Sequence, residues 1–234
     1  MSEEQRVVMV TGAAGNLGRA VAEAFAAVGD SLVLVDRNEA ALVAAFGEPS
    51  PRRQFGPVNL LVQAEVDSMV RVALDRFGRI DVLCNLAGGF RMGEAVHETT
   101  PQTWDFLLDL NARSIVHTAR AVVPAMLARG RGAIVNVAAN AAVRGGATMG
   151  AYAASKSVVL RLTESMAAEL REQGINVNCV MPSIIDGPEN RRAMPDADPA
   201  RWVAPHDLAA VVVFLASDAA RAVHGAALPV VGLS

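Results

Sequence analysis

Tyr152 and Lys156 form the pair of side chains best suited to acid–base chemistry in this sequence. They lie one turn apart in a segment of helical periodicity, so they share one face of a predicted helix. A phenol with a pKa of about 10 is a poor acid or base near neutral pH. A lysine cation about 4 Å away stabilises phenolate by up to a few kcal/mol. We therefore expect Lys156 to lower the pKa of Tyr152 towards the working range.

A second candidate site is the glycine-rich segment Thr11 to Gly18, which follows the first apolar run and opens the first helical segment. Gly12 permits a tight turn, Gly15 allows the backbone to approach a pyrophosphate, and Gly18 lets the helix pack closely. Free N–H groups at a helix start favour an anion. The segment therefore predicts a dinucleotide site. The residues assigned to it are Gly12, Ala14, Asn16, Leu17 and Gly18.

Asp36 ends the second apolar run, where a carboxylate accepts hydrogen bonds from the adenosine ribose of a bound dinucleotide. The same carboxylate repels a 2′-phosphate, which favours NAD(H) as the cofactor. The neighbouring Arg37 is the one feature that favours NADP(H), so this second cofactor stays open. Both residues are assigned to the cofactor site.

Composition points to a small-molecule partner. The chain of 234 residues is 52% hydrophobic and 4% aromatic, and its net charge is -3 at pH 7. Charges of both signs are interspersed, which favours neither nucleic acid nor a membrane surface as a partner. The 4 histidines show no metal-ligand spacing, so we expect no metal.

The cysteines and the N-terminal residues predict a cytoplasmic protein. Cys84 and Cys179 lie in apolar, strand-like runs, which indicates buried thiols in a reducing compartment. The segment Met1 to Arg6 lacks the basic and apolar regions of an export signal. No apolar run approaches the roughly 20 residues that cross a bilayer.

Short apolar runs alternate with longer segments of helical periodicity along the chain. The predicted buried strands are Arg6–Thr11, Ser31–Asp36, Ile80–Asn85, Ala133–Ala138, Ile175–Met181 and Ala227–Val231, with a weaker one at Pro57–Val62. The predicted helices are Leu17–Val28, Val66–Phe77, Thr103–Ala128, Ala151–Gln173 and His206–Ala216. This alternation predicts one α/β domain over residues 1–234, a doubly wound parallel sheet with helices on both faces. The proline-rich segment Pro182 to Pro205 suggests a mobile lid.

Four motifs in this order resemble the short-chain dehydrogenase/reductase family. They are the turn Thr11–Gly18, the segment Asn85–Gly88, Asn111 within Leu110–Ala112, and Tyr152–Lys156. The resemblance implies a Rossmann-type, seven-stranded parallel sheet and hydride transfer with a nicotinamide cofactor. It gives Tyr152 the role of acid/base, Lys156 a hold on the nicotinamide ribose, and Asn111 the support of a water relay. It also implies a homodimer or homotetramer.

The resemblance extends the cofactor site beyond the glycine turn. Asn59 matches a position where the family often has an aspartate beside the adenine. The further cofactor residues that it implies are Leu60, Asn85, Ala87, Gly88, Pro182, Ile184 and Ile185. The candidate substrate residues on the loops around Tyr152 are Phe90, Ala139, Asn140 and Met149.

Ala139 stands where the family usually has a serine that hydrogen-bonds the substrate carbonyl. Loss of one such donor costs about 10² to 10³ in rate. Three explanations stay open: Asn140 supplies the donor, the substrate needs little polarisation, or the protein binds dinucleotide without catalysis. Dihydropteridine reductases, a divergent branch of the family, also have alanine here and use NADH on a quinonoid substrate. This chain is similar to them at Ala87–Phe90 and Ile185–Arg191.

Overall fold

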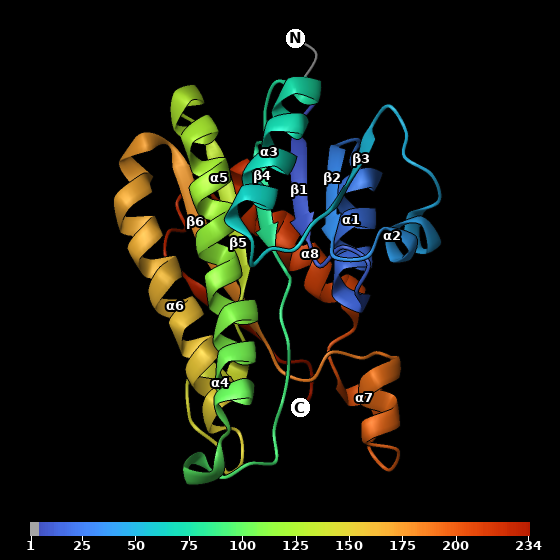
Figure 1. Cartoon of the computed structure of the whole chain (residues 1–234), viewed down its shortest axis with the longest axis vertical. Helices are drawn as coiled ribbons and strands as arrows, with labels where there is room; N and C mark the ends of the chain where they lie inside the picture. Colours follow the sequence, from blue (N-terminus) through green and yellow to red (C-terminus); the bar gives the residue numbers. More distant parts are fainter. Residues whose placement is uncertain (1–4) are drawn as a thin grey trace.

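A single parallel sheet of seven strands forms the centre of the computed structural model, which describes residues 5–234 (Figure 1). The strand order is β3-β2-β1-β4-β5-β6-β7. The strands are β1 Val7–Thr11, β2 Ser31–Asp36, β3 Arg53–Pro57, β4 Val82–Asn85, β5 Gly132–Val137, β6 Ile175–Pro182 and β7 Ala227–Val230. The doubly wound, seven-stranded α/β fold predicted from the sequence is confirmed. The segment Met1 to Glu4, on which part of the export prediction rests, lies outside the described residues.

Helices cover both faces of the sheet because both faces of the central strands are apolar. The helices are α1 Asn16–Ala27, α2 Glu39–Phe46, α3 Gln63–Phe77, α4 Pro101–Leu108, α5 Ser114–Arg129, α6 Gly150–Leu170, α7 Pro188–Ala193 and α8 Pro205–Leu215. Buried side chains of α1, α2 and α8 pack on one face, and those of α3, α5 and α6 pack on the other. The short α7 stands away from the sheet, at the end of the molecule where α4 lies (Figure 1).

The strand order reverses between β1 and β4, and this reversal locates the ligand-binding edge. β1 pairs with β2 on one side and with β4 on the other, and Thr11 is the register partner of Asn85. Connections from adjacent strands leave in opposite directions at such a point and open a crevice at the carboxyl ends. The glycine turn after β1 and the loop after β4 therefore lie next to each other.

Two sequence predictions of elements are wrong. The strand predicted at Pro57–Val62 lies earlier in the chain, as β3, and ends at Pro57. β3 is an edge strand that contains Arg53 and Gln54, so its sequence lacks the apolar run of a central strand. The helix predicted at Thr103–Ala128 is two helices joined by a π-helical turn, Asp109–Arg113. The segment Pro182 to Pro205 contains α7 and a parallel bridge between Ile185 and Val203, and its role as a mobile lid stays a prediction. Helix α2 was not predicted at all.

None of the helices in residues 5–234 is both long enough and apolar enough to cross a bilayer.

Candidate active site

The glycine turn is closely packed, because main-chain atoms lie where Cβ atoms at Gly12 and Gly18 would be. Gly12 has a φ of +65°, and a Cβ there would lie 3.0 Å from the Cα and N atoms of Ala87. A Cβ at Gly18 would lie 2.8 Å from the Cα of Ala13. Gly15 is the N-cap of α1 and has no side chain that could accept a hydrogen bond. The N–H groups of the first turn therefore stay available to an anion. The predicted positions Asn16, Leu17 and Gly18 form that turn.

Asp36 is fixed at the end of β2 by two main-chain hydrogen bonds. Its Oδ2 accepts from Ala14 N at 3.1 Å and its Oδ1 accepts from Arg37 N at 2.8 Å. The carboxylate therefore lies against the glycine turn, as the cofactor prediction requires. The side chain of Arg37 is exposed beside it.

The loop Leu86 to Gly89 connects the glycine turn to the predicted catalytic residues. Thr11 Oγ1 accepts hydrogen bonds from Leu86 N at 3.0 Å and from Ala87 N at 3.1 Å. At the next residue, a Cβ on Gly88 would lie 2.8 Å from Asn111 Oδ1 and 3.2 Å from Lys156 Nζ. One short loop thus touches both halves of the candidate site.

Asn111 lies in the π-helical turn between α4 and α5, and its side chain is fully bonded. Its Oδ1 accepts from Gly89 N at 2.8 Å, and its Nδ2 donates to Gly89 O at 3.0 Å and to Ser155 Oγ at 2.9 Å. Ser155 Oγ in turn donates to Tyr152 O at 2.8 Å. π-Helical turns occur often at functional sites. This one aims Asn111 at both the loop after β4 and the helix that carries Tyr152.

Burial sets the ionisation of the two acid–base groups, which are the only tyrosine and the only lysine in the chain. Burial lowers the pKa of Lys156 to about 8, and its Nζ donates to Val137 O at 2.9 Å. Burial raises the pKa of Tyr152 to about 12. The expectation that Lys156 lowers the pKa of Tyr152 is wrong for the protein alone, because desolvation of the phenolate outweighs any attraction to the cation.

The predicted substrate residues differ in exposure, and one of them, Phe90, contacts Tyr152. The exposed ring of Phe90 packs edge-on against Tyr152, with ring centroids 4.8 Å apart. Ala139 is buried directly after β5, and the side chain of the next residue, Asn140, is exposed. Met149, the N-cap of α6, lines a cavity of about 150 Å³ with Arg91 and Thr103 among others. The loop carrying Phe90 is tied to this region by Gly93 N, which donates to Thr148 O at 2.9 Å.

Two predicted cofactor residues use their side chains in hydrogen bonds within the protein. Asn85 is buried; its Nδ2 donates to Asn136 Oδ1 at 2.9 Å and its Oδ1 accepts from Thr118 Oγ1 at 2.8 Å. Asn59 Oδ1 accepts from Leu61 N at 3.1 Å and so closes its own turn. Leu60 is buried. The side chain of Asn85 thus couples β4 to β5 and α5.

The segment after β6 closes the other side of the glycine turn. Asn16 Nδ2 donates to Asp186 O at 2.6 Å, across 170 residues of sequence. Ile184 O accepts from Val203 N at 2.9 Å, and Ile185 O accepts from Asn190 Nδ2 at 2.7 Å. Pro182 ends β6. The predicted residues of this segment are therefore anchored beside the start of α1.

Sequence reasoning assigned no role to Thr11 or Ser155, although both lie inside the quoted motifs. Thr11 directly precedes Gly12, and Ser155 directly precedes Lys156. A hydroxyl at such positions was a signal for a side chain that binds the neighbouring main chain. Within residues 5–234, no three His, Cys, Asp or Glu side chains are grouped to hold a metal ion.

Comparison with known proteins identifies the family. The family model of the short chain dehydrogenase matches residues 6–198. D-Threitol dehydrogenase of Mycolicibacterium smegmatis is 35% identical, over 97% of this chain and 92% of its own length. The chain belongs to the short-chain dehydrogenase family. Sorbitol dehydrogenase of Cereibacter sphaeroides is 37% identical, over 80% of this chain and 73% of its own length.

Solved structures of family members share the fold almost completely. Levodione reductase superposes with a TM-score of 0.89 at 31% identity, over 97% of this chain and 96% of that one. A 3-ketoacyl-(acyl-carrier-protein) reductase from Brucella melitensis, complexed with NADH, has a TM-score of 0.88 at 29% identity, over 98% of both chains. These relatives support a nicotinamide-dependent oxidoreductase of the short-chain dehydrogenase family.

Proposed function

We propose that this protein transfers hydride between NAD(H) and a small organic substrate, with Tyr152 as the acid/base. The observation that carries the proposal is the loop Leu86 to Gly89, which contacts the glycine turn at Gly12 and the side chains of Asn111 and Lys156. A dinucleotide seated on the start of α1 would run along this loop to Lys156. Binding and chemistry then belong to one continuous site.

We propose NAD(H) over NADP(H) because of Asp36. Its carboxylate accepts hydrogen bonds from Ala14 N and Arg37 N, which hold it in place at the end of β2. A 2′-phosphate placed there would meet a fixed negative charge. Arg37 is exposed and offers a competing attraction for that phosphate.

In this mechanism, the nicotinamide supplies or accepts the hydride, and the protein handles the proton. Tyr152 gives its phenolic proton to the substrate oxygen during reduction, or takes it during oxidation. Lys156 would hold the nicotinamide ribose, and in its protonated form its charge would stabilise the phenolate. Asn111, whose side chain is fixed by Gly89 and Ser155, would support a water relay that returns the proton to Tyr152.

Ala139 narrows the substrate class that this mechanism serves. A buried methyl group replaces the hydroxyl that would donate to a substrate carbonyl. The relatives named for sorbitol and threitol favour an alcohol and its ketone, whereas Ala139 favours a substrate that is already electron-poor, such as a quinonoid or pteridine-like compound. The exposed amide of Asn140 is the nearest candidate donor in sequence.

The test is NADH oxidation against a panel of ketones, quinones and quinonoid dihydropterin, with wild type and Ala139→Ser. We expect turnover of the electron-poor members by wild type, and faster ketone reduction by Ala139→Ser, by up to about 10². Ala138→Ser, which adds a hydroxyl one residue earlier, is the matched control and should give no gain. If ketones are the best substrates and Ala139→Ser changes nothing, the assignment to activated substrates fails.

A second candidate function is dinucleotide binding without catalysis. Two observations favour it: the missing hydroxyl at Ala139 and the raised pKa of Tyr152. This alternative predicts tight NADH binding and no turnover with any member of the panel. Turnover of one member that disappears in Tyr152→Phe would reject it.

We also propose that the protein forms a cytoplasmic homodimer or homotetramer. Apolar side chains are exposed on α4, α5 and α6, namely Trp104, Val116, Leu127 and Val158. The buried, unpaired Cys84 and Cys179 suit a reducing compartment. Light scattering of the purified protein gives the molar mass directly, and a monomer would contradict the assembly.

A further inference from the structure

A second cavity lies at the amino ends of the strands, the edge of the sheet opposite the candidate active site. Its volume is about 220 Å³, and residues at the starts of β4, β5 and β6 form its floor, including Val82, Ala133 and Asn176. No sequence motif and no step of the proposed reaction uses this cavity. Four arginines line it: Arg6, Arg131, Arg171 and Arg221.

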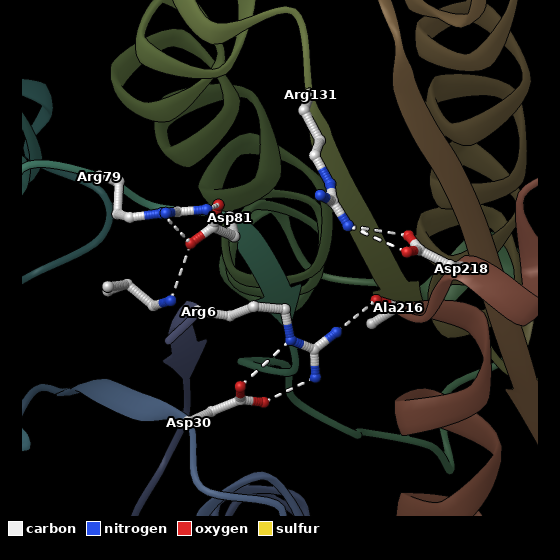
Figure 2. Close-up of polar contacts among 8 residues, drawn as sticks. Arg6, Asp30, Arg79, Asp81, Arg131, Ala216 and Asp218 are labelled. Atoms are coloured by element: carbon white, nitrogen blue, oxygen red, sulfur yellow. Dashed lines mark hydrogen bonds and ion pairs between the residues drawn. The ribbon is translucent and has the colours of Figure 1, made fainter. Parts of the chain in front are cut away.

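Arg6 is a structural member of this cluster, because nearby acceptors occupy its guanidinium. It forms hydrogen bonds to Asp30 Oδ1 at 3.1 Å and Oδ2 at 2.7 Å, and a third to Ala216 O at 3.0 Å (Figure 2). Ala216 caps the carboxyl end of α8, so Arg6 also offsets the partial negative charge of that helix end. The Asp30 hydrogen bonds raise the pKa of Arg6.

Asp81, the buried carboxylate of the cavity, is likewise fully occupied. Its Oδ2 accepts from Val7 N at 2.9 Å and from Arg79 Nε at 2.7 Å, and its Oδ1 accepts from Arg79 Nη2 at 2.5 Å (Figure 2). Arg79 therefore neutralises this carboxylate, and Asp218 is the other carboxylate that lines the cavity. Because Asp81 is paired with Arg79, it would repel an anion in the cavity only weakly.

Arg131 has a partner that an anion would readily displace. Its guanidinium pairs with Asp218 at 2.9 Å, but their side chains are 62% and 84% exposed. Solvent-exposed pairs of this kind contribute little to stability. An anion in the cavity would compete for Arg131 at small cost.

Arg171 and Arg221 complete the excess of positive charge. Among residues 5–234, no carboxylate forms an ion pair with either of them, whereas Arg6, Arg79 and Arg131 all have one. His224 adds a further potential donor at the same wall. This local excess stands in a chain whose net charge is -3.

We propose that this arginine cavity binds the dianionic phosphate group of a small ligand. Guanidinium groups match phosphate oxygens with paired hydrogen bonds, and the four arginines that line the cavity outnumber its two carboxylates, Asp81 and Asp218, which favours an anion. The volume accommodates a phosphate with a small organic body. A bound phosphate would link Arg171, before β6, to Arg221, before β7, with Arg131 as a third donor.

The test is a titration of the isotopically labelled full-length protein with inorganic phosphate, glycerol 3-phosphate or acetate at matched ionic strength. Amide resonances of Gly132, Ala133 and Gly174 report on the cavity, and those of Gly12 and Ala14 report separately on the glycine turn. We expect saturable shifts at the cavity with both phosphates and none with acetate. Tighter binding of the ester indicates a phosphorylated metabolite, and equal binding indicates free phosphate.

Variants locate the binding. Arg171→Gln combined with Arg221→Gln should raise the Kd for phosphate at the cavity at least about tenfold, without changing shifts at the turn. Arg71→Gln combined with Arg120→Gln removes the same charge from exposed positions on α3 and α5, and should leave the Kd unchanged. Arg171→Lys with Arg221→Lys keeps the charge and should give an intermediate Kd. Cavity resonances that do not move, or move equally in the Gln pair and wild type, would overturn the proposal.

Discussion

The two halves of the candidate active site are built from different parts of the chain. The dinucleotide half consists mainly of main-chain atoms in close approach, as at Gly12 against Ala87, with Asp36 held by two N–H groups. The catalytic half consists of buried side chains, Tyr152 and Lys156, whose pKa values burial moves to about 12 and about 8. The contacts of the first half are already formed in the protein alone. In the second half, burial favours the neutral forms of Tyr152 and Lys156.

We propose from this difference that ligand binding completes the catalytic half. Burial favours neutral forms of both groups, so the protein alone holds a neutral phenol and a lysine that loses its proton near pH 8. The dinucleotide half needs no such adjustment.

Gly18→Ala should disable the dinucleotide half. The new Cβ would overlap main-chain atoms of Gly12 and Ala13, which are backbone and cannot swing aside as a side chain does. The turn must therefore shift, and we expect the Kd for NADH to rise about 10². Fluorescence titration with NADH measures it. Gly145→Ala is the control, because its Cβ would meet nothing within 4 Å; equal Kd values for the two variants would contradict the close-packed turn.

Asp36→Asn should change the cofactor preference rather than disable the site. The amide keeps one acceptor for Ala14 N or Arg37 N but removes the charge that opposes a 2′-phosphate. We expect the ratio of the Kd for NADPH to that for NADH to fall about tenfold or more. Asp105→Asn, an exposed position on α4, removes the same charge and should leave the ratio unchanged. A preference for NADPH in wild type would refute the role of Asp36.

In the catalytic half, we expect a smaller effect, a dependence of the free energy of unfolding on pH. The pKa of Lys156 is lowered in the folded state, so between pH 8 and pH 10 the unfolded chain keeps a proton that the folded protein has released. The free energy of unfolding should therefore rise with pH, by up to about 1 kcal/mol per unit. Below pH 8, both states are protonated and the contribution is constant.

Denaturant unfolding across this pH range, for wild type and Lys156→Met, isolates the lysine contribution as a difference. The raised pKa of Tyr152 acts in the opposite direction, but only above pH 10, where the unfolded chain loses the phenolic proton first. A wild-type stability that falls relative to Lys156→Met between pH 8 and pH 10 would contradict the buried lysine.

Most of the fold was predictable because its central strands are buried on both faces. The apolar runs at β1, β2, β5 and β6 show this directly. The prediction fails at the edge, where β3 reads Arg-Gln-Phe-Gly-Pro, and where one apolar periodicity continues through the π-helical turn around Asn111. At both places, tertiary contacts rather than the local sequence pattern determine the secondary structure.

The site shows the same limit. The motifs correctly brought together Gly12, Gly88, Asn111 and Lys156, since strand order alone places their loops at one edge. The direction of a side chain at a strand end was not predictable: Asn85 turns inward because Asn136, on the neighbouring strand, and Thr118 bind its amide. The ionisation of Tyr152 was also missed, because burial is a property of the folded surroundings.

The most direct test of the whole account compares wild type with Tyr152→Phe in two measurements: NADH affinity by fluorescence, and hydride transfer to the best substrate of the panel in a single turnover. Phe preserves the ring that packs against Phe90 at 4.8 Å, so the fold should persist. We predict that the Kd for NADH changes less than about twofold while the rate falls about 10² to 10⁴. An unchanged rate would contradict the role of Tyr152, and lost NADH binding would contradict the separation of the two halves.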